Sequence, residues 1–262
     1  MLRRLWAIWI LEWKNAWVYR GDALLRMAMG AATIALSYLL WRAVFAGRAQ
    51  VEGYTLPEMT TYYLLGRLFY PLTQSDGLLP EYAGEIKSGA YAKYQVRPLS
   101  PLGYFFVASL GRMALPLLLT ALPLVAAQGL LPGALAPLDW RNVAAALPVL
   151  ALGTALHLLV QFLLAMTTFR FTDIGFTYTL QHLMVEFLSG AMIPLGLLSG
   201  GTWSAYLPFA YWVYHPAQLM LGKSAVSPTL ATAVLAGWVL AALGLALWVQ
   251  RRAPQRFEGV GL

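Results

Sequence analysis

The chain has 262 residues, of which 60% are apolar and 11% charged, and its formal net charge is +7. It contains no cysteine, which excludes disulfides and thiolate metal sites. The apolar residues form long blocks without apolar/polar alternation, which argues against a soluble domain and against an outer-membrane barrel. Each block approaches the roughly 20 residues that a helix needs to cross a bilayer. The blocks lie near 24–45, 59–80, 102–127, 142–168, 176–198 and 229–250. We therefore predict an all-α, polytopic membrane protein with six transmembrane helices in a single domain, 1–262.

Residues 1–21 precede the first block and predict an interfacial helix instead of a span. At 100° per residue, four tryptophans fall within an arc of about 80°, while the cations share the opposite side. A helix of this kind lies in the cytoplasmic membrane interface. We expect either a simple anchor or an elbow helix that braces a cytoplasmic partner. Gly21-Asp22 is expected to turn the chain into the first span, and we expect no cleavable signal peptide.

The second block, 59–80, is unusually polar and leads into the longest polar stretch of the chain, 81–101. Its acidic and basic residues suit a short surface helix, which Gly89 weakens and two prolines close before the third span. A second, tighter turn follows the fourth span at 169–175. We expect both segments on the cytoplasmic side.

Segment 200–228, between the fifth and sixth spans, is apolar and aromatic but broken by Pro208 and Pro216. Each helical piece is too short to cross a bilayer. A re-entrant pair of half-helices on the external side fits this pattern, because irregular backbone is tolerated at membrane depth only when protein surrounds it. The alternative is a belt of Trp and Tyr at headgroup level.

The cations indicate the orientation. With a cytoplasmic N-terminus and six spans, the cytoplasmic side holds Arg3, Arg4, Lys14, Arg20, Arg26, Lys87, Lys93, Arg97, Arg170, Arg251, Arg252 and Arg256. The outer side holds Arg42, Arg48, Arg141 and Lys223. Cytoplasmic loops normally carry the excess of Lys and Arg, so we expect both termini in the cytoplasm.

Polar residues form stripes within two of the blocks. A charge at the centre of a spanning helix costs at least ~2.5–3.5 kcal/mol, so polar stripes should face the bundle interior or a water-filled path. Spacings of three and four residues place these side chains on one face of each helix. We predict that the second and fifth spans line a route for solute with Tyr63, Arg67, Tyr70, Gln74, Tyr178, His182, Glu186 and Ser189.

A purely structural role for some of these groups stays open. Glu186 could pair with His182 one helical turn away, or with Arg112 on a neighbouring helix. His157 in the fourth span is expected to be a core residue.

The sequence offers little support for catalysis. Gly222-Lys223-Ser224 ends like a phosphate-binding loop, but Ala217 stands where its first glycine should be, and no strand precedes it. We find no metal cluster and no nucleophile with a base and an orienting group. We expect that the chain alone is not an enzyme and binds no cofactor.

The order of these segments resembles the membrane subunit of a type-2 ATP-binding-cassette (ABC) exporter. Short strings carry the resemblance: EIKSG at 85–89, RPL at 97–99, LSGAMIP at 188–194, LPF at 207–209 and YHP at 214–216. The similarity extends over essentially the whole chain, but it carries no signature of a particular solute.

The resemblance implies two cytoplasmic ATPase subunits, which hold ATP and Mg, and a second, identical or paralogous permease subunit. It also implies a bacterial cytoplasmic (inner) membrane location, and no nucleic-acid partner. Segment 81–101 would be the coupling segment, with a second contact at 170–175. The ATPase-coupling candidates are Glu81, Glu85, Lys87, Gly89, Arg97, Arg170 and Asp173. The Tyr, Thr and Gln lining of the route favours an amphipathic or lipophilic solute such as a drug-like molecule, a toxic cation or a glycolipid.

Two other functions remain open from the sequence. A secondary transporter or channel could relay protons through His182 and Glu186, although no inverted repeat is recognisable. A membrane enzyme acting on lipids could use His and Glu as acid and base, although the three histidines lie in separate segments.

Overall fold

The computed structural model describes residues 2–73, 78–95, 99–130, 133, 135–171, 175–198 and 202–252. Within these ranges the chain is helical and has no strand, apart from an isolated β-bridge between Val51 and Tyr54. The α-helices are α1 (Leu2–Val18), α2 (Arg20–Val44), α3 (Leu56–Thr73), α4 (Leu78–Lys87), α5 (Ala92–Gln95), α6 (Pro101–Leu130), α7 (Trp140–Met166), α8 (Gly175–Leu188), α9 (Tyr214–Met220) and α10 (Pro228–Arg252). Short 3-10 turns are η1 (Thr167–Phe169), η2 (Leu195–Leu197), η3 (Thr202–Tyr206) and η4 (Phe209–Tyr211).

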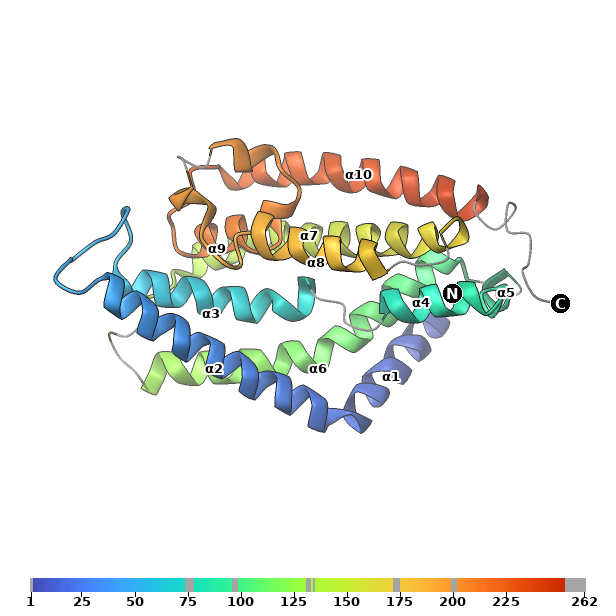
Figure 1. Ribbon diagram of the computed structural model, residues 1–262, viewed down its shortest axis with the longest axis horizontal. Coiled ribbons are helices and arrows are strands. Elements are labelled where there is room, and N and C mark those ends of the chain that lie inside the picture. The colour runs from blue at the N-terminus through green and yellow to red at the C-terminus, as the bar shows by residue number, and fades with distance from the viewer. Residues whose placement is uncertain are drawn as a thin grey trace.

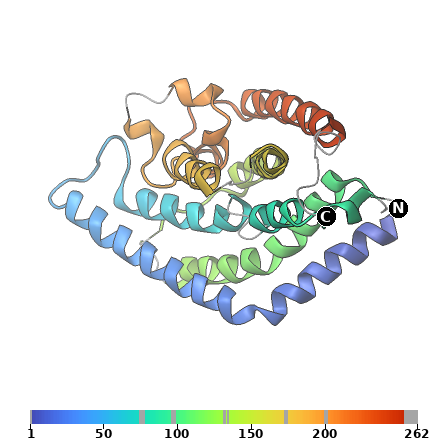
Figure 2. The ribbon, with the colours of Figure 1, turned by 45° about the vertical axis from the view of Figure 1, so that its right-hand side comes forward.

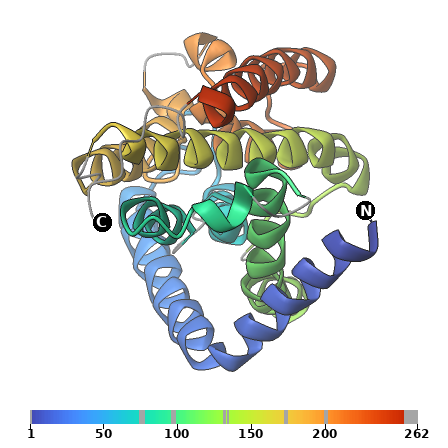
Figure 3. The ribbon, with the colours of Figure 1, turned by 90° about the vertical axis from the view of Figure 1, so that its right-hand side faces the viewer.

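The long helices run roughly along one axis of the molecule, and α4 and α5 lie at one end of it (Figure 1). Viewed from that end, α7 lies between α10 on one side and α3 and α4 on the other (Figure 3). Helix α7 packs against α10 and α9, α3 packs against α2 and α6, and α1 packs along α6. Helices α1 and α2 meet at an angle below the rest of the bundle (Figure 2). The last turn of α10 lies at the same end of the molecule as α4 (Figure 1).

Four helices of the described residues are long and apolar enough to cross a membrane: Arg20–Val44, Pro101–Ala121, Trp140–Phe169 and Pro228–Arg252. They correspond to the first, third, fourth and sixth predicted spans. In the most apolar 18-residue stretch of α2 only 6% of the residues are buried, and in that of α10 only 17% are buried. Most of the apolar surface of these two helices is therefore not packed against other parts of the chain. An apolar surface of this kind fits a lipid or protein environment.

The two other predicted spans differ from expectation. Helix α3 has 18 residues but is too polar to count among the apolar spans, and α8 has only 14 residues. At 1.5 Å per residue, α8 is about 21 Å long, less than the ~30 Å hydrocarbon core. The prediction of a fifth span over 176–198 is wrong at its far end. Gly190 adopts a left-handed φ of +82°, and Pro194 lacks the amide proton that a continuing helix needs.

Helix α1 confirms a separate N-terminal helix, but the predicted turn at Gly21-Asp22 is wrong. The chain turns at Tyr19, and α2 begins at Arg20. Gly21 and Asp22 lie in the first turn of α2, where an acidic side chain interacts favourably with the positive end of the helix dipole. The segment between the fifth and sixth spans is broken, as expected, into η3, η4 and α9.

Candidate functional site: a helical hairpin and a polar face

Helices α4 and α5 form a helical hairpin that contains most of the predicted coupling residues. Helix α4 ends at Lys87, and the turn passes through Gly89, whose φ of +74° is the left-handed conformation that glycine adopts without strain. The Tyr91 amide then donates to the Glu85 carbonyl over 3.0 Å, which closes the turn. The turn has a defined geometry because these backbone bonds fix it.

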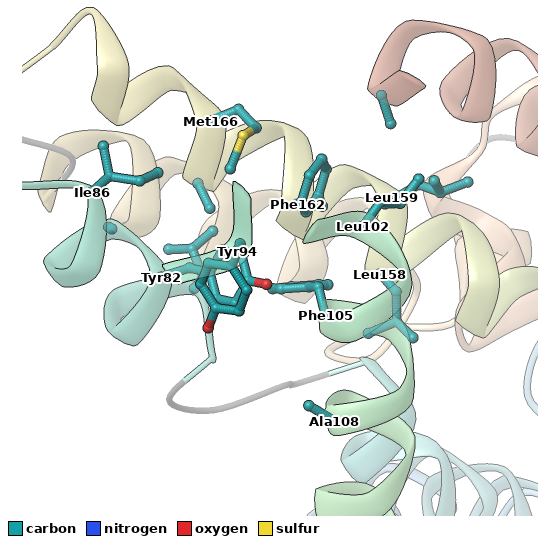
Figure 4. Close-up of a cluster of buried hydrophobic side chains, with 14 of the residues drawn as sticks. Tyr82, Ile86, Tyr94, Leu102, Phe105, Ala108, Leu158, Leu159, Phe162 and Met166 are labelled. Carbon is teal, nitrogen blue, oxygen red and sulfur yellow. The ribbon is translucent and has the colours of Figure 1, made fainter. Parts of the chain in front are cut away.

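An aromatic cluster attaches this hairpin to the ends of α6 and α7 (Figure 4). The Tyr82 ring stacks on Tyr94 with centroids 5.0 Å apart and meets the edge of Phe105 at 5.1 Å. Phe105 of α6 in turn meets Phe162 of α7 at 5.6 Å. The Tyr82 hydroxyl also donates to the Pro101 carbonyl over 3.0 Å. The hairpin, α6 and α7 therefore share one close-packed core and should move together.

Tyr91 extends this core toward the second predicted cytoplasmic turn. Its ring meets Phe169 of η1 edge-on at 5.0 Å. Burial raises the pKa of the Tyr82, Tyr91 and Tyr94 hydroxyls well above the ordinary value, so all three remain neutral. Arg170 follows η1 and is exposed. The predicted contacts at 81–101 and 170–175 thus begin on adjacent elements.

The exposed tip of the hairpin consists of small residues and one cation. Lys87, Ser88, Gly89 and Ala90 are all exposed. Glu85 differs, because its side chain is only 15% exposed and pairs with Lys93 of α5 inside the hairpin. Arg97 and Asp173 lie outside the described residues. Among the predicted coupling residues, Lys87 and Gly89 can therefore contact a partner directly, while Glu85 holds the hairpin together.

Arg112 of α6 joins the hairpin to the N-terminal helix. Its Nε donates to Glu12 of α1 and its Nη1 to Glu81 of α4, each over 2.7 Å. Glu12 is buried with 4% exposure, whereas the Glu81 side chain is 44% exposed. One guanidinium thus connects three helices. Because Arg112 pairs with Glu12 and Glu81, it does not form the pair with Glu186 that the sequence left open.

The predicted pathway residues of α3 lie in different environments. The Tyr63 hydroxyl donates to the Met192 carbonyl over 2.8 Å, which ties α3 to the segment after α8. The Arg67 guanidinium lies 4.4 Å from the centre of the Tyr70 ring, and its Nε is buried without a hydrogen-bond partner. Gln74 lies outside the described residues.

The predicted polar residues on α8 and just after it also differ in how far they are buried. His182 Nε2 lies 3.9 Å from Glu186 Oε1, and the two side chains are 42% and 46% exposed. Ser189 is fully buried, and its carbonyl accepts a 2.9 Å bond from the Tyr214 amide. Tyr178 packs partly buried against the aromatic cluster. Of this stripe, the His182 and Glu186 side chains are nearly half-exposed, whereas Ser189 is fully buried.

Sequence reasoning missed two residues of this site, Glu12 and Gly111. The α1 helix lies so close to α6 that a Cβ on Gly111 would come within 2.8 Å of the Glu12 Cβ and 2.9 Å of the Trp9 carbonyl. A signal for Glu12 was present, because it is the single acid in an otherwise apolar and basic helix. Its partner lies 100 residues away, which no local pattern reveals.

The described residues contain no group of three or more metal-ligating side chains. Helices of this length and apolar character define a multi-pass α-helical membrane protein, here with a rigid hairpin at one end. The chain matches the model of the ABC-2 family transporter proteins over residues 31–261 and belongs to that family, which confirms the resemblance seen in its sequence. It is thus a transmembrane subunit of an ABC transporter and not itself the ATPase, and the family implies an ABC ATPase partner. Comparisons with curated proteins and with solved structures give no match.

Proposed function

We propose that this chain is one transmembrane half of an ABC exporter, which docks through the tip of the α4–α5 hairpin on a cytoplasmic ATPase. The complete transporter would contain two ATPase subunits, which bind ATP and Mg, and two permease subunits. The proposal keeps six spans, with α3 as the second and α8 together with the non-helical residues that follow it as the fifth, and it assigns both termini to the cytoplasm of a bacterial inner membrane. This proposal agrees with the excess of cations on that side.

The observation that carries the proposal is the construction of the hairpin. Its tip is exposed and made of small residues, so a partner's groove could approach its backbone closely. Its base shares a packed aromatic core with α6 and α7, and Arg112 links it to α1. A displacement of the tip by the ATPase would therefore be transmitted to three long helices. ATP would act by favouring one of two packings of the bundle.

The proposed solute class is supported by the face formed by α2, α3 and α8. Most of the exposed side chains on α2 and α8 are apolar. The charged or titratable groups in the middle of these helices and of α3 are the half-exposed His182 and Glu186 and the partly buried Arg67. Such a surface suits an amphipathic or lipophilic solute better than a small inorganic ion. Transport would be outward, as in the exporters that the chain resembles.

The test uses the purified complex of this chain with its ATPase, reconstituted in vesicles. K87E and A90W change the exposed tip without touching the core, so each should reduce ATPase co-purification and ATP-dependent solute movement. R48E is the matched control, because Arg48 is exposed in the loop between α2 and α3 at the opposite end. Full coupling in K87E and A90W would contradict the docking assignment.

The half-exposed His182–Glu186 pair favours one alternative function, a secondary transporter. A carboxylate and an imidazole one helical turn apart could exchange a proton. Transport that follows a proton gradient in vesicles without ATPase or ATP would support this alternative and contradict an ATP-driven exporter.

A further inference from the structure

Arg67 carries a charge in the middle of α3, and it forms no ion pair with an acidic side chain of the described residues. Its guanidinium covers Gly30 of α2 so closely that a Cβ at Gly30 would lie 2.5 Å from Arg67 Nη2. The Tyr70 ring is its neighbour on the same helix. In the part of the chain that the structure describes, every ion pair joins other groups. A charge within a membrane helix normally faces the bundle interior and has a partner, so this one calls for an explanation.

Glu186 presents the complementary problem on α8. Its carboxylate is 46% exposed, and its contact with the equally exposed His182 is long at 3.9 Å. The neighbouring side chains Leu183 and Phe187 are apolar and exposed. Glu186 therefore stands on an apolar helix face that no other part of the described chain covers.

The two charges lie at similar depth. Gly30, which contacts Arg67, is ten residues from the start of α2 at Arg20, and Glu186 is eleven residues from the start of α8 at Gly175. At 1.5 Å per residue these positions are about 15 and 16 Å along their helices. Both helices start toward the end that carries α4, and α3 lies between them on the face nearest the viewer in Figure 1, as Figure 2 agrees.

We propose that Arg67 of one copy pairs with Glu186 of a second copy of this chain, and that the pair occurs twice across a twofold axis. Opposite charges at one depth, on a single face with apolar surroundings, make this face self-complementary. A second copy supplies an opposite charge to both groups at once, whereas an anionic lipid could supply one to Arg67 alone. The inference rests on the proposed function, because it identifies the second permease half as an identical chain.

The natural absence of cysteine allows a direct test. Two differently tagged forms, R67C and E186C, are co-expressed with the ATPase and treated in membranes with a short crosslinker that carries two thiol-reactive methanethiosulfonate groups. The crosslinker is used because a disulfide requires Cα atoms within about 7 Å, less than an Arg–Glu pair spans. The expected product joins the two tags. L240C is the matched control, because Leu240 is exposed on α10, away from this face. No product between R67C and E186C, or as much from L240C with E186C, would overturn the pairing.

Charge reversal gives a second measurement on the dimer. R67E and E186R should each weaken association of the two copies at least about tenfold, and R67E/E186R in one chain should restore it. If Arg67 instead holds an anionic lipid or solute, the double reversal stays as weak as the single ones, which overturns the proposal. Co-purification of the ATPase with the unaltered chain is measured in parallel. If the ATPase does not co-purify, the proposed function is contradicted. If the ATPase co-purifies but no crosslink forms between R67C and E186C, only the pairing is contradicted.

Discussion

Arg112 Nε lies 2.7 Å from the buried carboxylate of Glu12, and the same guanidinium reaches Glu81 over an equal distance. Three helices that are separate in sequence thus share one cation. The two bonds are unequal in burial, because the Glu12 side chain is 5% exposed and that of Glu81 is 44% exposed. The energetic consequences should be unequal too, since water screens the outer pair and not the inner one.

The first prediction concerns this inequality. R112L leaves the Glu12 charge buried without a partner and should lower the free energy of unfolding by about 3 kcal/mol. E81Q should cost less than about 1 kcal/mol, because its pair is exposed. Adding E12Q to R112L should recover part of the loss, since the orphaned charge is gone. Denaturant unfolding in detergent measures all three, and an E81Q loss equal to that of R112L would refute the assignment.

The second prediction uses two helical glycines with opposite surroundings. G111A forces a methyl group against the Glu12 Cβ and the Trp9 carbonyl, so α1 must move off α6 and stability should fall by about 1–3 kcal/mol. G237A meets nothing within 4 Å and should be neutral or stabilise by up to about 1 kcal/mol through helix propensity. Thermal unfolding of the two variants gives the comparison. Equal shifts of the same sign would show that α1 is not packed against Gly111.

Hydropathy predicted α6, α7 and α10 to within a few residues, because long apolar runs have few alternatives to a spanning helix. It failed where a local backbone conformation decides the outcome. Gly190 lies just beyond the end of α8, well before the apolar run ends. The chain turns at Tyr19 and not at Gly21, where the sequence predicted the turn. Such outcomes depend on tertiary contacts that override propensity.

The candidate site was predictable in position more than in detail. The polar stretch 81–101 contains a surface helix, as expected, but Glu85 turned out to pair inside the hairpin with Lys93. The sequence offered Arg112 as a possible partner of Glu186, whereas its partners come from α1 and α4. Charge pattern identifies which residues need partners, whereas only the packing of distant helices identifies the partners.

The third prediction concerns Gly190, where the chain leaves α8. Its φ of +82° disfavours any other residue, and a Cβ would lie 2.9 Å from both the Tyr214 Cβ and the Tyr62 hydroxyl. That hydroxyl donates to the Gly190 carbonyl over 2.6 Å. G190A should therefore cost at least about 1 kcal/mol more than G53A, which has a similar φ of +79° but open space around it. Similar losses in denaturant unfolding would mean that backbone strain alone matters at Gly190.

The fourth prediction separates a residue that builds the hairpin from one that touches the partner. E85Q and K93Q each break the ion pair within the hairpin and should reduce ATP-dependent transport, and the exchanged pair E85K/K93E should recover most of it. The exchange keeps the attraction between α4 and α5 but reverses both charges. K87E should not be rescued by any change within the hairpin, because the Lys87 side chain is exposed and its interaction lies outside the chain. ATPase stimulation in reconstituted vesicles measures each variant. If E85K/K93E stays as impaired as E85Q, then Glu85 itself contacts the ATPase, and its place among the residues that hold the hairpin together would be wrong.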